Sequence, residues 1–411
     1  MCGLAGFFNR NGAPADEGIV QRMMSRLSHR GPDDQGCWTG GPVGLGLCRL
    51  SVMDPTERGH QPFVTPQGIL VYNGEVYNFR ELRRELEELG RTFHGESDTE
   101  VVAQALSEWG PEKAVPRFNG MFALAWHEAD NNLLWLARDR AGIKPLYLAE
   151  VGGVIAFASE AKALFAHPQI LCRADMHTLT THMFFYRLAG EWTPFESVRS
   201  LLPGTLHRID GAGQTETVFF DVVRDLDPDR IVRRADESLE VLADEFESLF
   251  CDSVRSRLVS DAPIGLLCSG GVDSSLVTAV ASKEQRGLPA YVADIESASV
   301  SEADKAREVC RHVGADFRPV PFSREDFFRE WADCVYHNDE PLYFPFNLPA
   351  RVVFRQAQRD GLKVLLGGEG ADELFGGYSW QAEMYRHGQR CLRSRTVMKF
   401  FPRLHRLGKR M

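Results

Sequence analysis

The sequence lacks the features that mark several large classes of protein. Its longest apolar runs, such as residues 121–126, are far too short to cross a bilayer. Its start, MCGLAGFFNRNG, meets polar residues before a secretory signal could form. The nine cysteines include no CxxC pair, which argues against zinc and disulfide frameworks and predicts free thiols in a reducing cytosol. With a net charge of −10, nucleic acid is not expected as the main partner. We therefore expect a cytoplasmic protein with no membrane span.

The remaining composition is that of an ordinary globular protein with room for two or three domains. Of the 411 residues, 44% are apolar and 25% are charged. The first half consists of short alternating runs broken by Gly, Pro, Asn and Asp, which indicates β-strands. From residue 239 onward strands and helices alternate, as is typical of a doubly wound parallel sheet. We predict an α+β domain at 1–215, a charged linker at 216–238 and an α/β domain at 239–411.

Local patterns predict individual elements in both halves. Two helices should begin at Asn78 and Ser97, because an acid follows each of them three residues later, in the spacing of a capping box. Strand-like runs lie at 43–50, 69–72, 121–127, 133–137, 264–268, 291–295 and 362–366, and further helices are predicted at 272–282, 302–313 and 348–359. The basic, acid-free segment 384–411 is expected to be a solvated helix.

A cysteine stands at position 2, next to the initiator methionine. If Met1 is removed, the thiol and the α-amine belong to the same residue. The amine has an intrinsic pKa of ~7.7–8.0, so part of it is neutral at pH 7 and can act as a base. A terminal amine can therefore activate its own side chain without a histidine. Taken alone, Cys2 is as well explained as a small residue near the start of the chain.

Eight sequence blocks, the first of which contains that cysteine, occur in a fixed order. They are MCGLAGF, SHRGPDDQG (28–36), RLSVMD (49–54), GHQPF (59–63), YNGEVYN (72–78), GESDTE (95–100), NGMFALA (119–125) and RDRAGIKPLY (138–147). Together they closely resemble the class II glutamine amidotransferase domain, whose fold is an αββα sandwich of the N-terminal-nucleophile type. The resemblance runs through about residue 205 and implies a glutaminase with Cys2 as its nucleophile.

The resemblance also assigns roles that suit the chemistry of glutamine. Arg49 matches the residue that binds the α-carboxylate, and Glu75 and Asp98 match those that bind the α-ammonium group. Asn73 and the backbone amide of Gly74 match the oxyanion hole. Each residue also has an ordinary interpretation: Arg49 as a surface ion pair, Asp98 as a first-turn acid of a helix, and Asn73-Gly74 as a hairpin turn.

A Gly- and Ser-rich loop at 269–275 lies between a predicted strand and a predicted helix. Glycines free backbone amides to face an anion, and the helix amino end adds partial positive charge. The chain has no GxxxxGK[ST] sequence. The loop resembles the SGGxDS loop of ATP pyrophosphatases, which split ATP into AMP and pyrophosphate. The resemblance implies pyrophosphate contacts for Ser269, Gly270, Gly271, Asp273, Ser274 and Ser275.

A second block, GGEGADELFGGY at 367–378, follows an apolar run. It is similar to the SGEGxDExFGGY segment of asparagine synthetases. By this resemblance Gly368 contacts the nucleotide, Glu369 sits at the acyl-adenylate centre, and Asp273 and Asp372 hold Mg²⁺, for which carboxylate oxygens are suitable ligands. The ordinary interpretation is that these acids only cap helices.

The two resemblances combine in the glutamine-hydrolysing asparagine synthetase family and imply glutamine, aspartate and ATP as substrates. A free carboxylate is a poor electrophile toward ammonia, so ATP must first convert it into an acyl-adenylate. Ammonia released at Cys2 would reach β-aspartyl-AMP through a tunnel between the domains. A homodimer is common in this family.

Some positions depart from the family pattern, and alternatives stay open. Gly367 replaces a frequent serine, Ala293-Asp294 replaces a small residue and glycine, and Ala141 replaces an aromatic residue. Family members continue well past Tyr378, so the chain is a fragment, a shortened homologue, or a glutaminase with a non-functional synthetase half. The acceptor could instead be a sugar-acid or peptide carboxylate, and a non-catalytic interaction protein is a further alternative.

Overall fold

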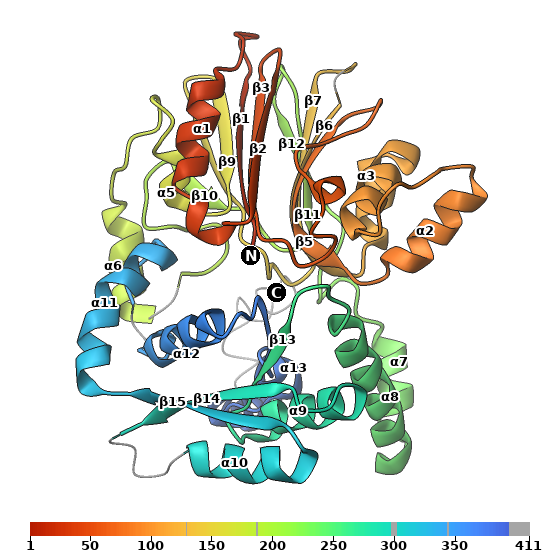
Figure 1. The fold of residues 1–411 in the computed structure, drawn as a ribbon, viewed down its shortest axis with the longest axis vertical. Helices are drawn as coiled ribbons and strands as arrows, with labels where there is room; N and C mark the ends of the chain where they lie inside the picture. Colours follow the sequence, from red (N-terminus) through yellow and green to blue (C-terminus); the bar gives the residue numbers. More distant parts are fainter. Residues whose placement is uncertain (129, 186–187, 297–301, 343–344, 394–411) are drawn as a thin grey trace. The chain divides into compact units, whose positions relative to one another are not determined.

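The computed structural model describes residues 1–128, 130–185, 188–296, 302–342 and 345–393, and for 388–393 it describes the backbone alone. The described chain forms two compact units, whose elements are labelled in Figure 1. The first unit comprises Met1–Ile264, Ala293–Ala298 and Val320–Val364, and the second comprises the rest. Residues 239–264 and 320–364, which the sequence analysis assigned to the second domain, therefore pack in the first unit. The predicted boundaries along the sequence stay a prediction.

The first unit contains two six-stranded antiparallel sheets that face each other (Figure 1). One has the order β10-β8-β9-β1-β3-β2 and the other β12-β11-β7-β6-β5-β4. The first sheet is built from β1 (Gly3–Asn9), β2 (Asp34–Gly40), β3 (Val43–Arg49), β8 (Tyr147–Val151), β9 (Val154–Ala158) and β10 (Val198–Ser200). The second is built from β4 (Phe63–Val64), β5 (Ile69–Val76), β6 (Gly120–Glu128), β7 (Leu133–Arg138), β11 (Thr205–Ile209) and β12 (Gln214–Val218).

Helices cover the outer face of each sheet (Figure 1). α1 (Glu17–Ser25) and α5 (Ala161–Leu164) pack on the first sheet, and α2 (Phe79–Glu88) and α3 (Asp98–Trp109) pack on the second. α4 (Pro111–Ala114) follows α3. This arrangement is the predicted αββα sandwich, and the α+β class of the first half is confirmed.

Burial on both faces explains why β1 reads as a continuous apolar run. Leu4 and Phe8 point into the core between the two sheets, whereas Ala5 and Phe7 point toward α1 and α5. A strand buried on one face alone would alternate apolar and polar residues. The sandwich therefore holds the start of the chain in the centre of the first sheet.

The first unit also contains helices from residues 176–257 and from residues 320–364. They are α6 (Met176–Phe185), α7 (Pro228–Arg234), α8 (Leu239–Arg257), α11 (Arg324–Asn338) and α12 (Asn347–Arg359). The predicted linker at 216–238 includes α7, because Asp227 accepts hydrogen bonds from two first-turn amides and Pro228 suits the first helical position.

The remaining strands form a four-stranded sheet of order β15-β14-β13-β16, in which β13 and β14 pair in parallel. The strands are β13 (Ile264–Leu267), β14 (Pro289–Ile295), β15 (Asp316–Phe322) and β16 (Val364–Leu366), and the helices of the second unit are α9 (Val272–Glu284), α10 (Glu302–Val313), α13 (Ala371–Phe375) and α14 (Ser379–Arg393). The alternation of parallel strands and helices confirms the α/β class of the second half. Of the basic segment 384–411, residues up to Arg393 are helical and the rest lie outside the described residues.

The two helices predicted from capping-box spacing are present as α2 and α3, but neither has a side-chain cap bond. Ser97 Oγ is buried and has no hydrogen-bond partner. The Glu100 carboxylate instead accepts from the amides of His94 and Gly95, so it fixes the preceding loop and does not turn back to Ser97. Among the described residues, no helix combines the length and the apolar character that crossing a bilayer requires.

Candidate functional site

Cys2 lies directly before β1, in the centre of the first sheet. Its thiol donates to the carbonyl oxygen of Leu50 at 3.6 Å and accepts from the Leu50 amide at 3.4 Å. The carbonyl oxygen of Cys2 accepts from Arg30 Nε at 2.9 Å. Burial raises the pKa of the thiol above its usual value, so the thiol needs a base to ionise near pH 7.

The amino terminus supplies an amine that is neutral at pH 7. Burial of the Met1 amine, with smaller contributions from Arg30 and Lys144, lowers its pKa to about 5. An amine with that pKa is neutral at pH 7 and can accept a proton. Removal of Met1 would move the α-amine onto Cys2, next to the thiol that it has to deprotonate.

Asn73 and Gly74 lie within strand β5 and not in a turn, so the hairpin interpretation is wrong. The pairing of β5 with β6 is continuous across both residues. Asn73 is 2% exposed, and its Nδ2 atom has no hydrogen-bond partner among the described residues. A buried donor without a partner is uncommon in folded proteins and indicates a place where a ligand atom completes the hydrogen bond.

The pairing of β5 with β6 directs the backbone N–H of Gly74 away from β6. Gly74 lies opposite Phe122, whose amide donates to Asp139 Oδ2 and whose carbonyl accepts from the Asp139 amide. Because both polar groups of Phe122 point toward β7, the pair Gly74–Phe122 is a non-hydrogen-bonded pair. The Gly74 N–H therefore points to the opposite edge of β5.

The neighbouring amides on that edge of β5 have partners. The Tyr72 amide donates to Gln61 Oε1 at 2.7 Å, and the Val76 amide donates to Asp98 Oδ2 at 2.9 Å. The Gly74 amide lies between them and has no partner among the residues that the structure describes. Together with Asn73 Nδ2, it offers two donors that the protein leaves free.

Two carboxylates lie close to these donors. Asp98 is 3% exposed and accepts from the Tyr72 hydroxyl at 2.7 Å, and burial raises its pKa to about 6. Glu75 is largely buried, and burial and then the charge of Asp98 raise its pKa well above the usual range. Both raised pKa values indicate a site that would favour a bound cation. Asp98 is the first residue of α3, but its carboxylate faces β5, so the interpretation as a simple first-turn acid is wrong.

Arg49 is buried and makes no ion pair among the described residues, so the surface ion-pair interpretation is wrong. It is 6% exposed and donates to the carbonyl oxygens of Met53 (3.1 Å), Asp54 (2.5 Å) and Thr56 (3.2 Å). These bonds use three of the five N–H donors of the guanidinium and leave two for an anion. Arg49, Thr56 and Ser51 line a cleft of about 710 Å³.

Lys144 and Tyr72 were not among the predicted site residues. The charge of Lys144 lowers the pKa of both the Cys2 thiol and Glu75, which places this buried cation near both groups. Lys144 belongs to the block RDRAGIKPLY, and a lysine between apolar residues in such a block is a signal that could have identified it. The Tyr72 hydroxyl orients Asp98, and nothing in the local sequence indicates this contact.

The loop 269–275 forms a tight turn between β13 and α9. Gly270 has a φ of +75°, and a Cβ atom there would lie 2.7 Å from the Ala306 amide nitrogen, so only glycine fits. Ser269 Oγ lies 3.0 Å from Ser274 Oγ, which fixes the two ends of the turn. A Cβ atom on Gly271 would meet only Ser269 Oγ at 3.5 Å, so the amino end of α9 is open to a ligand.

The second block packs directly on this loop. A Cβ atom on Gly368 would lie 2.8 Å from the Ser274 amide nitrogen and 3.0 Å from the carbonyl carbon of Asp273. Asp372 lies in the first turn of α13, and its carbonyl accepts from the amides of Gly376 and Gly377. The fold therefore brings the two predicted nucleotide-binding segments together, and Glu369 lies exposed beside them in sequence.

Comparisons with known proteins match two segments of the chain to two families. Residues 1–220 match a family model described as a glutamine amidotransferase domain, and residues 245–410 match one described as asparagine synthase. Similar curated proteins include asparagine synthetases [glutamine-hydrolyzing] 1 and 3 of Bacillus subtilis, at 35% and 32% identity over 92% of this chain and 59% and 64% of theirs. Asparagine synthetase B of Escherichia coli is 30% identical over 92% of this chain and 65% of its own. The chain thus spans less than two thirds of the length of these relatives.

Proposed function

The chain belongs to the family of glutamine amidotransferase domains, and from this premise we propose that it is an ATP-dependent, glutamine-hydrolysing ligase of the asparagine synthetase type. Its first half would release ammonia from glutamine, and its second half would activate a carboxylate as an acyl-adenylate. The match of residues 245–410 to the asparagine synthase model supports the second step. Aspartate as the acceptor, Mg²⁺ as the cofactor and a cytoplasmic location are part of this proposal.

The observation that carries the proposal is the pair of unused donors, Asn73 Nδ2 and the Gly74 amide, beside the carboxylate of Glu75. Glutamine satisfies each local requirement at once, since its α-ammonium group suits the two buried acids and its α-carboxylate suits Arg49. Its amide carbonyl becomes an oxyanion on attack, and the two donors would stabilise that charge. The effect of Glu75 on the pKa of Cys2 supports a position near the thiol.

The hydrolysis follows from these positions. The neutral α-amine of Cys2 takes the thiol proton, and the sulfur attacks the amide carbon of glutamine. The tetrahedral oxyanion is held by Asn73 Nδ2 and the Gly74 amide until the carbon–nitrogen bond breaks. The leaving nitrogen takes the proton from the amine and departs as ammonia. Water then cleaves the thioester, which releases glutamate and restores the thiol.

The second half would use ATP. The amides of the 269–275 loop and the amino end of α9 suit the pyrophosphate portion of the nucleotide. Asp273 and Asp372 would hold Mg²⁺, which offsets phosphate charge when bound, and both lie in the first turn of a helix. Aspartate attack on the α-phosphorus gives β-aspartyl-AMP and pyrophosphate near Glu369. Ammonia then displaces AMP and forms asparagine.

One pair of variants tests the two halves separately. Cys2→Ala should abolish glutamate release from glutamine, whereas pyrophosphate release with aspartate, ATP and ammonium should persist. The matched control is Cys172→Ala, which removes an exposed thiol of the same unit and should leave both activities intact. Retained glutamine hydrolysis in Cys2→Ala would contradict the glutaminase. Failure of aspartate to promote pyrophosphate release in the wild-type protein would contradict aspartate as the acceptor.

A further inference from the structure

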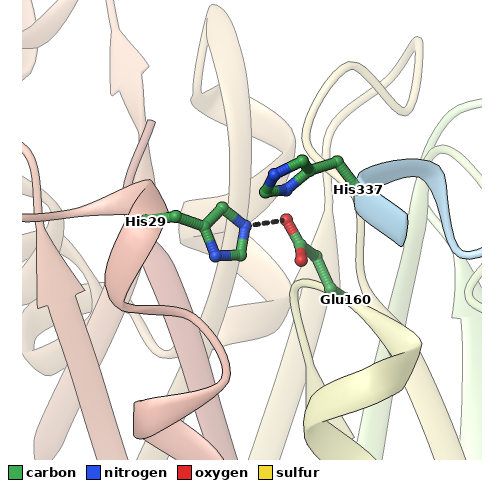
Figure 2. A group of neighbouring side chains, drawn as sticks. All are labelled: His29, Glu160 and His337. Atoms are coloured by element: carbon green, nitrogen blue, oxygen red, sulfur yellow. Dashed lines mark hydrogen bonds and ion pairs between the residues drawn. The ribbon is translucent and has the colours of Figure 1, made fainter. Parts of the chain in front are cut away.

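Figure 2 shows a group of side chains in the first unit, around the buried carboxylate of Glu160, that the proposed reaction does not use. His29 comes from the 3-10 helix Ser28–Arg30, Glu160 directly precedes α5, and His337 lies near the end of α11. His29 Nε2 is 3.0 Å from Glu160 Oε1, and the two imidazole rings meet edge to face at 4.5 Å. Two imidazoles and a carboxylate could in principle hold a transition metal.

The surroundings of Glu160 favour an ion-pair cluster over a metal site. Glu160 Oε1 accepts from Arg30 Nη1 at 2.8 Å, and Oε2 accepts from Lys162 Nζ. Burial opposes ionisation of this carboxyl, but hydrogen bonds from His29 and its other partners outweigh that effect and lower its pKa to about 2. A divalent cation would lie beside two buried positive charges, and their repulsion disfavours it. Glu160 therefore acts as the anion that holds Arg30 and Lys162.

On one side this cluster reaches the proposed nucleophile. Arg30 donates with Nη1 to Glu160 and with Nε to the carbonyl oxygen of Cys2 at 2.9 Å. The side chains of Arg30 and Glu160 are 9% and 7% exposed, so water has little access to replace either bond. Because the guanidinium is planar and rigid, the position of Glu160 sets the direction from which Arg30 holds the Cys2 backbone.

On the other side the cluster reaches the segment that matches the asparagine synthase model. Lys162 Nζ lies 3.0 Å from Asp339 Oδ1, and the Lys162 amide donates to Asp339 Oδ2 at 3.1 Å. Asp339 is the C-cap of α11, with a φ of +57°. Residue 339 lies within 245–410, whereas Lys162 lies within 1–220. The Asp339 carboxylate thus joins the two matched segments inside one compact unit, as do the contacts of Asp261 with Asp54 and of Lys363 with Asp33.

The geometry points to a positioning relay, Asp339–Lys162–Glu160–Arg30, that sets the backbone of Cys2 according to the position of the end of α11. This inference rests on the proposed function and deepens it, since it makes glutamine hydrolysis dependent on the synthetase segment. Each link is a buried charge pair, and breaking one leaves an uncompensated charge that rearranges its neighbours. A ligand that shifts the end of α11 would therefore change the reactivity of Cys2.

Asp339→Asn and Glu160→Gln in the full chain test the relay, because both keep the size of the side chain and remove its charge. We expect each variant to lower the kcat of glutamine hydrolysis about tenfold or more, with little change in KM, because the nucleophile is misplaced and the substrate contacts remain. The rate of Cys2 alkylation by iodoacetamide, measured by mass spectrometry, should fall in parallel. The matched control is Asp333→Asn, because Asp333 also lies on α11 and its exposed carboxylate pairs with Arg351 of α12; this variant should change neither rate.

The double variant separates a relay from two independent structural effects. In a relay, Glu160→Gln combined with Asp339→Asn should be no slower than the slower single variant, since both break the same chain of contacts. Additive effects, or unchanged kcat and alkylation rates in a folded Asp339→Asn, would overturn the inference. Asp339→Glu keeps the charge and should recover much of the lost rate. If the wild-type protein hydrolyses no glutamine, the proposed function fails, and the alkylation rates still decide the relay.

Discussion

Replacing Asn73 with alanine should lower kcat without lowering the free energy of unfolding. The Asn73 Nδ2 group is buried and has no hydrogen-bond partner in the part of the chain that the structure describes. A buried, unsatisfied polar group costs about 1–3 kcal/mol of folding free energy. In the proposed reaction the same group donates a hydrogen bond to the oxyanion. The unpaired donor therefore lowers the stability of the free protein but stabilises the transition state.

Both effects have a predictable size. Loss of one oxyanion-hole donor typically removes about 2.7–4 kcal/mol of transition-state stabilisation, which lowers kcat by about 10²–10³. Alanine also removes the unpaired donor, and this gain opposes the loss of the packing that the amide made. We therefore expect the free energy of unfolding to stay constant or to rise by about 1 kcal/mol. An ordinary truncation of a buried side chain would lower it.

The assay combines steady-state glutamate release with denaturant unfolding followed by tryptophan fluorescence, since Trp126 and Trp135 lie in the core of the first unit. The control is Asn9→Ala. Asn9 Nδ2 in the side chain donates to the carbonyls of Ala13 and Pro14, so this variant should lose about 0.5–1.5 kcal/mol of stability and keep its activity. A near-normal kcat in Asn73→Ala, together with a clear loss of stability, would refute the assignment of Asn73 as a free donor.

Two further predictions concern the buried acid and the nucleotide loops. Because burial raises the pKa of Asp98 to about 6, the unfolded carboxyl ionises first, and wild-type stability should fall as pH rises from about 4 to about 6. Asp98→Asn should show a smaller fall in melting temperature, because the buried Glu75 still contributes a fall of the same sign, and its KM for glutamine should rise; an unchanged pH dependence would contradict the shift. Gly368→Ala would place a Cβ atom 2.8 Å from the Ser274 amide nitrogen, so it should suppress pyrophosphate release and spare glutamine hydrolysis. Gly213→Ala, where a Cβ atom meets nothing within 4 Å, is its control and should leave both activities unchanged.

The sequence predicted helices and strands best where a single buried face of the element determines the pattern of apolar residues. The helix predicted at 302–313 is α10 with the same bounds, and the helix predicted at 348–359 differs from α12 by one residue. Strand β1 was not predicted as an element, since its residues are buried on both faces and show no alternation.

Tertiary contacts overruled two local signals. Asn73-Gly74 has the composition of a hairpin turn, but pairing with β6 and packing between the sheet layers keep both residues in β5. The Ser97–Glu100 spacing predicted the start of α3 correctly, although Glu100 binds the amides of His94 and Gly95 and leaves Ser97 Oγ without a partner. Spacing along the chain indicates where a helix begins, and burial decides which partners its polar groups find.

The relay could not have been predicted from the sequence alone. Arg30, Glu160 and Asp339 are far apart along the chain, and each is an ordinary charged residue in its local sequence. Periodicity and capping rules concern residues within a few positions of one another, so they carry no information on such a contact. Only the fold, which places 28–30, 160–162 and the end of α11 together, reveals the group.

The two candidate sites differ in how far they are prepared before a substrate binds. The donors of Asn73 and Gly74 and the acid Asp98 are fixed by the sheets, whereas Gly271 and Glu369 lie exposed on loops. A preorganised glutaminase would hydrolyse glutamine whenever it is present, and the ammonia would be lost to solvent if no acyl-adenylate awaited it. Some physical link from the synthetase segment to Cys2 is therefore required for efficient use of glutamine. In the proposed relay, the contact of Asp339 with Lys162 would supply such a link, and it does not involve Arg49, Glu75 or Asp98, the residues proposed to bind glutamine.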